Sequence, residues 1–307
     1  MSGEFPFAAE PVAPAHAGAL RKAFAAAAKR AWCYYLPFVY CYSLPPGRVV
    51  FFAEQAGAHL LLVRRDTPDG PQADLLAPPV PFSADVLDAV LAGLLRANGG
   101  RPARILWVDE ADAHRLPEDR FVVRLKDTEY VYDPARIAAA EGRAYRDLRK
   151  RLSRFCRETR AHFRTMETAD VAACHQLLRH WRRRQGRKHG FLLDWGYTRA
   201  ALDRYGQRGY EDLQGWCVEV SGRIAAFGMG GQMQPDLANF FAAKSDPDIR
   251  GLSEYLRWNV YRSLKDYRFV NDAGDLGLPG LRRHKEKFRP VARIPIYTAE
   301  QRAEEAP

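Results

Sequence analysis

The side chains best suited to catalysis lie in a short stretch near the C-terminus, where Asp275 follows an expected strand in a glycine-rich turn. A carboxylate held in such a turn can orient or deprotonate an attacking nucleophile. It can equally close an Asx-turn or cap a helix expected over residues 278–288. Arg282 and Lys285 lie on that helix, where they could bind a phosphate or a developing oxyanion, or form a solvated basic face. His284 lies among these cations, which disfavour its protonation.

A second set of candidate residues surrounds the start of another expected helix, in the loop 248–253. The backbone N–H groups and the dipole at a helix N-terminus favour an anion, so Arg250 and Gly251 are candidates for binding a phosphate. A plain N-cap by the Asp or the Ser of this loop is the alternative. Glu254 is either an acid/base group or half of a capping box. The candidate catalytic residues are therefore Asp275, Glu254 and Arg282.

Positive charge is concentrated in one segment of the chain. The whole sequence has a net charge of +10, but residues 143–188 contain 15 Lys/Arg and four acids, so the remainder is close to neutral. Such concentration suits contact with phosphates. The residues expected to contact nucleic acid are Arg146, Lys150, Arg154 and Arg157 on one helix, and Arg182, Arg183 and Arg184 beside Trp181 at the end of another. Solvated helix ends are the alternative reading.

The composition limits the class of protein. With 307 residues, of which 47% are hydrophobic, the chain can bury a sizeable core in one large domain or two ordinary ones. The longest uncharged stretch, 31–47, is interrupted by prolines and too short to cross a membrane as a helix. The N-terminus lacks the features of a secretory signal, so we expect a cytoplasmic protein. Five widely spaced cysteines favour free thiols and predict no metal site.

Hydrophobic periodicity predicts two mixed α/β lobes, whose bounds, 1–128 and 129–307, are those implied by the family resemblance described below. The elements expected in the first are a helix (14–30), strands (48–52 and 59–65), a loop (68–81), a helix capped by Ser83, and strands (104–108 and 121–125). A long basic connecting helix over 134–160 should begin with Asp133 as its cap and Pro134 at its first position. The second lobe then reads strand, two helices, three strands, helix, strand, short basic helix and a final strand near Ile294.

This order of elements is that of the GNAT acyltransferase fold, and three motifs make the resemblance more specific. The run NDAGDLGLPGLRRHKEKFRP, residues 271–290, resembles a signature of the phosphatidylglycerol lysyltransferase C-terminal domain family. The segment EYVYDPARIAAAEGRAYRDLRKRLSRF, residues 129–155, looks like the entry segment of that family. Ala243-Lys244 followed by Arg250-Gly251 is a weaker match. The resemblance covers roughly 129–297 and implies a tandem GNAT fold, in which Lys244 and Asn271 join Arg250, Gly251 and Lys285 as substrate-binding candidates.

The resemblance also implies an activity. A member of this family is expected to be an aminoacyltransferase that moves an aminoacyl group from charged tRNA to a hydroxyl or amine acceptor, either a lipid head group or a small molecule. Aminoacyl-tRNA would be a co-substrate, with no bound cofactor. The chain lacks the multi-helix membrane half of the lipid-modifying synthases, so peripheral contact with an anionic membrane is the expected form of any lipid contact.

Two other functions stay open at this stage. A GNAT-type N-acyltransferase that uses a coenzyme A thioester is favoured by Arg250-Gly251, but Ser253 stands where such loops carry a second small glycine. A non-catalytic protein that binds RNA or anionic lipid through the basic segment is the third hypothesis. The activity of an aminoacyltransferase would be lost with ribonuclease, and an N-acyltransferase would be thermally stabilised by coenzyme A. A binding protein would bind its ligand without turnover.

Overall fold

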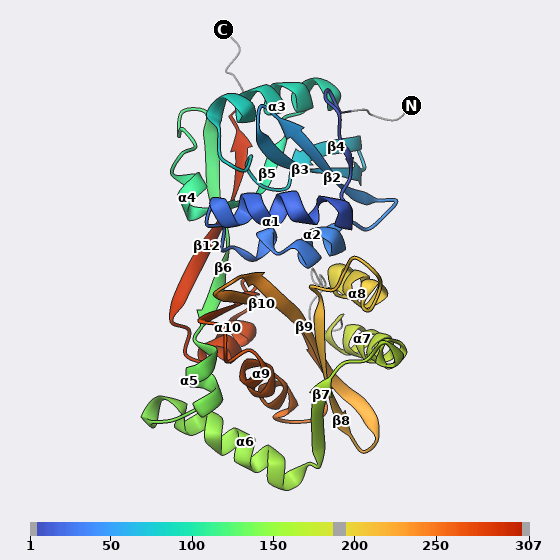
Figure 1. Cartoon of the computed structure of the whole chain (residues 1–307), viewed down its shortest axis with the longest axis vertical. Helices are drawn as coiled ribbons and strands as arrows, with labels where there is room; N and C mark the ends of the chain where they lie inside the picture. Colours follow the sequence, from blue (N-terminus) through green and yellow to red (C-terminus); the bar gives the residue numbers. More distant parts are fainter. Residues whose placement is uncertain (1–4, 187–194, 303–307) are drawn as a thin grey trace. The chain divides into compact units, whose positions relative to one another are not determined.

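The computed structural model describes residues 5–186 and 195–302, and these form two compact units (Figure 1). The first unit contains the chain up to residue 128 together with residues from 294 onward, and the second contains residues 129–293. Each unit is a mixed α/β structure with its own hydrophobic core. None of the helices in the described part of the chain has both the length and the apolar character needed to cross a membrane.

The first unit is a sheet covered by helices. Its strand order is β1-β2-β3-β4-β5-β12-β6, in which β4 and β5 pair in parallel and β12 pairs antiparallel to β5. Ser83 caps α3 as predicted, its hydroxyl accepting a hydrogen bond from the backbone N–H of Val86. The strands and helices of this unit are β1 (Glu10–Pro11), α1 (Ala17–Ala26), α2 (Leu36–Tyr42), β2 (Arg48–Gln55), β3 (Ala58–Thr67), β4 (Gly70–Leu75), α3 (Ala84–Ala97), β5 (Arg104–Asp109), α4 (Glu110–Ala113), most of β6 (Phe121–Tyr132) and most of β12 (Ala292–Gln301).

The second unit has the strand order β6-β11-β10-β9-β8-β7, to which β6 contributes its last residues. All neighbours pair antiparallel except β10 and β11. Figure 1 shows α9 on one face of this sheet and α7 and α8 on the other. The elements are α5 (Pro134–Ala139), α6 (Arg146–Glu158), β7 (Ala161–Thr165), α7 (Val171–Gly186), α8 (Trp195–Arg204), β8 (Gln214–Val220), β9 (Arg223–Gln234), β10 (Leu237–Ser245), α9 (Leu252–Ser263), β11 (Phe269–Gly274) and α10 (Pro279–Glu286).

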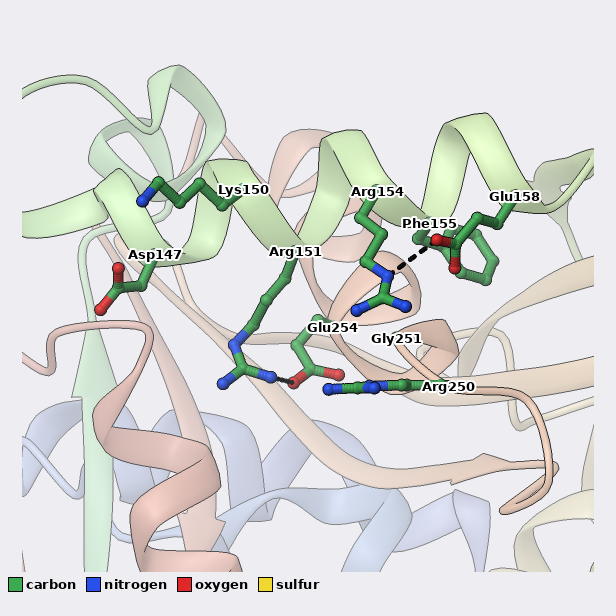
Figure 2. A pocket seen from close by; sticks show the side chains of 9 residues that line it. All are labelled: Asp147, Lys150, Arg151, Arg154, Phe155, Glu158, Arg250, Gly251 and Glu254. Atoms are coloured by element: carbon green, nitrogen blue, oxygen red, sulfur yellow. Dashed lines mark hydrogen bonds and ion pairs between the residues drawn. The ribbon is translucent and has the colours of Figure 1, made fainter.

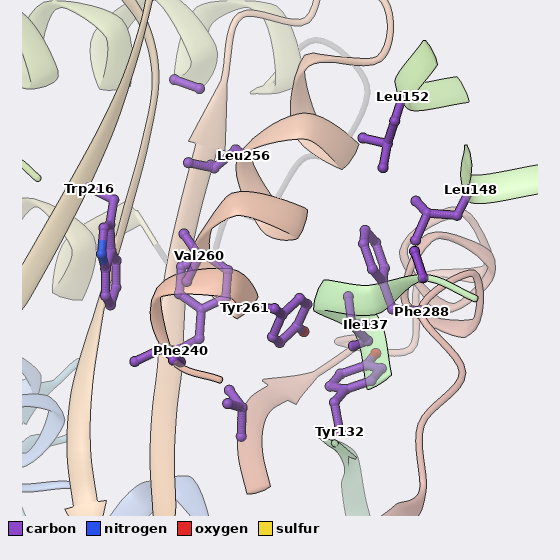
Figure 3. Close-up of a cluster of buried hydrophobic side chains, with 14 of the residues drawn as sticks. Tyr132, Ile137, Leu148, Leu152, Trp216, Phe240, Leu256, Val260, Tyr261 and Phe288 are labelled. Carbon is purple, nitrogen blue, oxygen red and sulfur yellow. The ribbon is translucent and has the colours of Figure 1, made fainter. Parts of the chain in front are cut away.

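The core of the second unit holds α6 and α9 in place. Leu148, Leu152 and Phe155 of α6 are buried in one cluster with Leu256 and Val260 of α9. Figure 3 shows Leu148 and Leu152 among these buried side chains. These α6 residues recur at spacings of three and four and form one buried apolar stripe. Burying that stripe fixes the rotation of α6, and the charged residues must lie on its other sides.

The single helix predicted over 134–160 is wrong. Asp133 does cap α5, its carboxylate accepting from the backbone N–H of Arg136. However, α5 ends at Ala139, and the C-cap residue Ala140 adopts a left-handed conformation with φ 49°. A one-turn 3-10 helix, Arg143–Tyr145, then leads into α6. The guanidinium of Arg149 donates to the carbonyls of Ala140 and Gly142, 2.5 and 2.8 Å away, and so holds the break in place.

Three further differences from the sequence prediction concern the first unit. Residues 68–81, predicted as a loop, contain β4, which pairs antiparallel with β3. Helix α2 was not predicted, because prolines and aromatic residues obscure its periodicity. The final strand was assigned to the second lobe, but β12 pairs with β5 from Ile296 to Glu300, so residues from 294 onward belong with the first unit.

Candidate functional site

A pocket of about 440 Å³ lies between α6 and the loop that opens α9. Figure 2 shows the side chains of Arg151 and Arg154 pointing from α6 toward Arg250 of that loop. The pocket therefore joins the basic helix face and the helix-opening loop that the sequence had identified separately. Its lining residues are Asp147, Lys150, Arg151, Arg154, Phe155, Glu158, Arg250, Gly251 and Glu254.

Gly251 allows this loop to pass close to α6. It precedes the first turn of α9 with φ 86°, a conformation that favours glycine. A Cβ built on Gly251 would lie 3.3 Å from the Cβ of Phe155, which is tighter than an ordinary contact. The buried ring of Phe155 thus sets how near the loop comes to α6, and a glycine is required at that point. The N-cap position of α9 is Gly251 itself, so neither Asp248 nor Ser253 occupies it.

The charges in the pocket leave a surplus of cations. Glu158 accepts a hydrogen bond from Arg154 at 2.8 Å, and Glu254 accepts one from Lys287 at 2.8 Å. Within the described parts of the chain, Lys150 and Arg250 have no ion-pair partner closer than 4 Å. An anion that enters the pocket would therefore meet cations whose charge is not already neutralised.

Glu254 is ionised, and its lowered pKa makes it a weak base. Burial by itself would raise its pKa, but the hydrogen bond from Lys287 and the charge of that ammonium hold the pKa below its usual value. Arg151 lies 3.9 Å from the same carboxylate. Glu254 therefore acts as a fixed negative charge that orients cations at the edge of the pocket.

His284 is neutral, as its cationic surroundings led us to expect. Its Nε2 lies 3.3 Å from the hydroxyl of Ser253 in the first turn of α9. Burial, followed by the charge of Arg257, lowers the pKa of His284 to about 3. At neutral pH the imidazole carries no charge, and its Nε2 either donates a hydrogen bond to the hydroxyl of Ser253 or accepts one from it, depending on the tautomer.

Asp275 lies in a separate cluster. Its carboxylate is buried and accepts hydrogen bonds from the hydroxyl of Tyr130 at 2.6 Å, from Nε of Arg282 at 2.8 Å and from the N–H of Gly277 at 2.9 Å. The last contact is the Asx-turn predicted as one local role, whereas the N-cap position of α10 is Leu278. Burial opposes ionisation, but the hydrogen bonds from Arg282 and Tyr130 hold the pKa of Asp275 below its usual value.

Arg282 is the member of this cluster that reaches solvent. Its side chain is 56% exposed, while one edge of the guanidinium is held by Asp275. Tyr130 stays a neutral phenol, because burial and the hydrogen bond to Asp275 raise its pKa to about 12. The arrangement presents an oriented cation, with Asp275 as the group that positions it.

Three of the predicted substrate-binding residues are buried instead of lining the pocket. Lys285 donates to the backbone carbonyl and to the carboxylate of Asp272, with Nζ 3.3 Å from Oδ1. Asn271 donates to Glu129 at 2.5 Å and accepts from the N–H of Ala273 at 2.9 Å. Lys244 is buried, with its ammonium 4.5 Å from the centre of the Trp181 ring.

Sequence reasoning missed the acid around which part of this network forms. Asp272 is buried and accepts from Tyr261 at 2.8 Å and from the guanidinium of Arg257. Burial would raise its pKa, but the charges of Arg257 and Lys285 hold it below the usual value. The signal that could have found it is a strand, β11, that reads as buried yet contains consecutive polar residues, Asn271 and Asp272.

The structure divides the predicted nucleic-acid contacts between two places. Lys150 and Arg154 line the pocket, whereas Arg146 and Arg157 are exposed elsewhere on α6. On α7, Arg182 lies 3.9 Å from the ring centre of Trp195 and Arg184 bonds to Asp248 at 2.5 Å, while Arg183 is exposed. Since Asp248 and Arg250 share one loop, the two basic helices approach it from two sides. Arg187 and Lys188, at the end of the basic segment 143–188, lie outside the described residues.

One group of side chains has the spacing of metal ligands. His180, Asp246 and Asp248 each offer an atom within 4.8 Å of the others. Both carboxylates are already in ion pairs, Asp246 with Arg223 at 3.0 Å and Asp248 with Arg184 at 2.5 Å. The positive charge beside these two carboxylates is therefore supplied by Arg223 and Arg184.

Comparison with known proteins assigns most of the chain to one family. Residues 37–300 match the family model described as phosphatidylglycerol lysyltransferase, C-terminal. No curated protein sequence matches the chain significantly.

Solved structures share the fold at low sequence identity. A conserved protein of unknown function from Bacteroides thetaiotaomicron has a TM-score of 0.71 and 18% identity, over 96% of this chain and 99% of that one. The L-PGS structure from Bacillus licheniformis has a TM-score of 0.60 and 16% identity, over 94% and 92% of the two chains. A tandem GNAT protein from the clavulanic acid biosynthesis pathway has a TM-score of 0.53 and 14% identity, over 95% and 98%. The chain has the tandem GNAT-like fold.

Proposed function

Because the chain belongs to the family of phosphatidylglycerol lysyltransferase C-terminal domains, we propose that it is an aminoacyltransferase that takes its aminoacyl group from charged tRNA. The acceptor in this proposal is a hydroxyl or amine on a lipid head group or a small molecule. Charged tRNA is made in the cytoplasm, so the reaction is assigned to that compartment. The family supports a transferase, and the pocket of the second unit supports this particular donor.

The observation that carries the proposal is the surplus of positive charge in the pocket between α6 and the α9 loop. Lys150 and Arg250 offer cations without ion-pair partners among the residues described, and the N-terminal end of α9 adds its dipole. Phosphates of a nucleic acid bind such surfaces by releasing counterions. We assign this pocket to the phosphates next to the acylated 3′ end, with Arg146 and Arg157 of α6, and Arg182, Arg183 and Arg184 of α7, contacting the phosphates that follow.

The chemistry needs no covalent intermediate. The acceptor oxygen or nitrogen attacks the ester carbonyl, its proton leaves, and the ribose hydroxyl of tRNA departs with a proton as the ester bond breaks. Arg282, half exposed and oriented by Asp275, is the cation assigned to the developing oxyanion. Asp275 is a positioning residue in this scheme, because its lowered pKa and its three hydrogen bonds leave it a weak base.

A coenzyme A thioester is the second candidate donor. The favouring observation is the position of Gly251 and Arg250 at the start of α9, where a pyrophosphate would also meet the helix dipole.

If the acceptor is a membrane lipid, the protein would reach it by peripheral contact between its cations and the anionic lipid.

The proposal is tested by following labelled amino acids from a pool of fully charged tRNA into a product that survives ribonuclease. Extracted anionic lipids and a pool of small amines serve as acceptors in separate reactions. We expect transfer that stops when the tRNA is digested first, and that falls at least tenfold in Arg250→Ala. The exposed Arg268→Ala, outside the pocket, should keep full activity. Transfer from acetyl-coenzyme A but from no charged tRNA would reject the proposal.

A further inference from the structure

Two parallel strands of the second unit separate at a pair of asparagines. β10 and β11 pair only from Leu237 to Asn239 and from Phe269 to Asn271, although β10 continues to Ser245 and β11 to Gly274. Asn239 and Asn271 are thus the last residues in register before the strands part. The carboxyl ends of parallel strands that separate form a natural opening for a ligand.

The amide of Asn239 is buried without a hydrogen bond. Its side chain is fully inaccessible, and among the described residues neither the amide nitrogen nor the amide oxygen has a hydrogen-bond partner. A buried amide without partners is costly, and native proteins rarely retain one without a reason. Its neighbour Asn271 does not share this state, because it bonds to Glu129 and to the N–H of Ala273.

Asn239 belongs to a polar row rather than to the apolar core. Ala238 and Phe240, on either side of it, point into the core against α9, so strand alternation turns Asn239 to the opposite face. Asn271 lies in register with it, and the bond from Asn271 places Glu129 on the same face. On the other side of Asn239 the residue in register is Gly231, which has no side chain to bond to the amide.

We propose that Asn239 is the residue that recognises the α-amino group of the transferred acyl chain, an inference that rests on the proposed function. An α-aminoacyl ester carries an ammonium donor and a carbonyl acceptor on neighbouring carbons. The amide of Asn239 offers the matching acceptor and donor, its oxygen taking a hydrogen bond from the ammonium and its nitrogen giving one to the carbonyl. The carboxyl group of Glu129, bonded to Asn271, lies in the same row.

With Asn239 in this role, the protein would distinguish aminoacyl donors from simple acyl donors such as acetyl-coenzyme A. An acetyl group has the carbonyl but no amine, so it would leave the amide oxygen of Asn239 unsatisfied. Sites built to hydrogen-bond a polar group reject analogues that lack it far more strongly than apolar pockets reject a missing methylene. Asn239 would therefore select aminoacyl groups over simple acyl groups.

The test compares total tRNA charged with all amino acids with the same tRNA after acetylation of the α-amino groups. In the wild type, kcat/KM should be at least tenfold higher for the free amine than for the acetylated donor. Asn239→Leu and Asn239→Ala should lose about tenfold or more with the free amine and little with the acetylated donor, so that the preference disappears. The melting temperature of Asn239→Leu should equal or exceed that of the wild type, because a buried amide without partners has been removed.

The matched control is Asn259→Leu. Asn259 is also a buried asparagine, but its amide donates to the carbonyl of Tyr255 at 2.9 Å. This variant should melt at a lower temperature and keep the full donor preference. If both Asn239 variants are folded and still prefer the free amine as strongly as the wild type, the assignment of Asn239 is overturned while the proposed function stands. If the wild type transfers nothing from either donor, the proposed function and this assignment both fall.

Discussion

At the scale of single residues, the account depends most on Gly251, because its left-handed conformation brings the α9 loop next to Phe155. We predict that Gly251→Ala destabilises the protein by about 1–3 kcal/mol and weakens tRNA binding, since the new Cβ is strained and crowds the ring. Thermal melting and filter binding measure the two effects.

Gly280→Ala is the matched control for that prediction. A Cβ at Gly280, in the first turn of α10, meets no atom within 4 Å, and its φ is not positive. Alanine should raise stability there by about 0.5–1 kcal/mol, because glycine disfavours a helix. Equal behaviour of the two variants would show that the loop at Gly251 tolerates a side chain and does not need its close approach to α6.

A second prediction at this scale concerns pH. The pKa of His284 in the folded protein is lowered to about 3, below the usual value of 6.5 for a free imidazole. Below pH 6.5 the unfolded chain therefore binds a proton that the folded chain does not, and stability should fall as the pH drops toward 3. Asp272, Asp275 and Glu254 have lowered pKa values, so the stability they add is present above about pH 4 and lost only below it.

The pH prediction is tested by urea unfolding of the wild type and His284→Gln at pH 7 and pH 4.5. The wild type should lose more stability than the variant over this interval, because glutamine removes the group that titrates in the unfolded chain. An identical loss in both proteins would mean that His284 is protonated in the folded state.

The sequence predicted some residues of the site and not others. Arg250 and Gly251 were identifiable because a loop that opens a helix has a recognisable pattern, and that pattern depends on local chain geometry. Lys285 looked like a surface cation, but it is buried against Asp272, a contact that only the tertiary structure creates. Asn239 gave no signal, because what sets it apart is the absence of a partner in a folded sheet.

At the scale of elements, α6 acts as the rigid support of the basic surface. Its buried stripe fixes its rotation, so Lys150 is held at the pocket. We predict that Lys150→Glu lowers the affinity for tRNA and reduces the slope of log affinity against log salt by about 1, as expected when one phosphate contact is lost. Filter binding between low and physiological salt measures both quantities.

Lys22→Glu makes the same change of charge on α1 of the first unit, where Lys22 is exposed. It should leave both the affinity and the salt slope unchanged. Equal losses in the two variants would indicate attraction to the net charge of the protein and would argue against a defined phosphate site on α6.

Amphipathic helices and hydrophobic strands were predictable because their periodicity is a local property. The break between α5 and α6 was not, because it depends on Ala140 in a left-handed conformation and on Arg149 binding the carbonyls around it. β4 was missed because its residues Gly70 and Pro71 suggest a turn, yet pairing with β3 makes the segment a strand.

At the scale of the whole molecule, the last strand, β12, belongs to the first unit, although it follows the second unit in the sequence. Ile296 and Ala299 of β12 are buried, and β12 pairs with β5. A chain that stops at residue 293 should therefore expose the core of residues 5–128 while keeping the sequence of the second unit. Limited proteolysis should cut first within residues 5–128. Cleavage at the wild-type rate in that region would contradict the assignment of β12 to the first unit.

The most direct test of the central claim is a thermal-shift series with charged tRNA, uncharged tRNA, coenzyme A and acetyl-coenzyme A. A ligand at 100 times its Kd should stabilise the protein by about 2.7 kcal/mol. We expect both tRNAs to raise the melting temperature, the charged form by more, because only the charged form contacts both the phosphate pocket and Asn239. A shift with coenzyme A and acetyl-coenzyme A but with neither tRNA would contradict it.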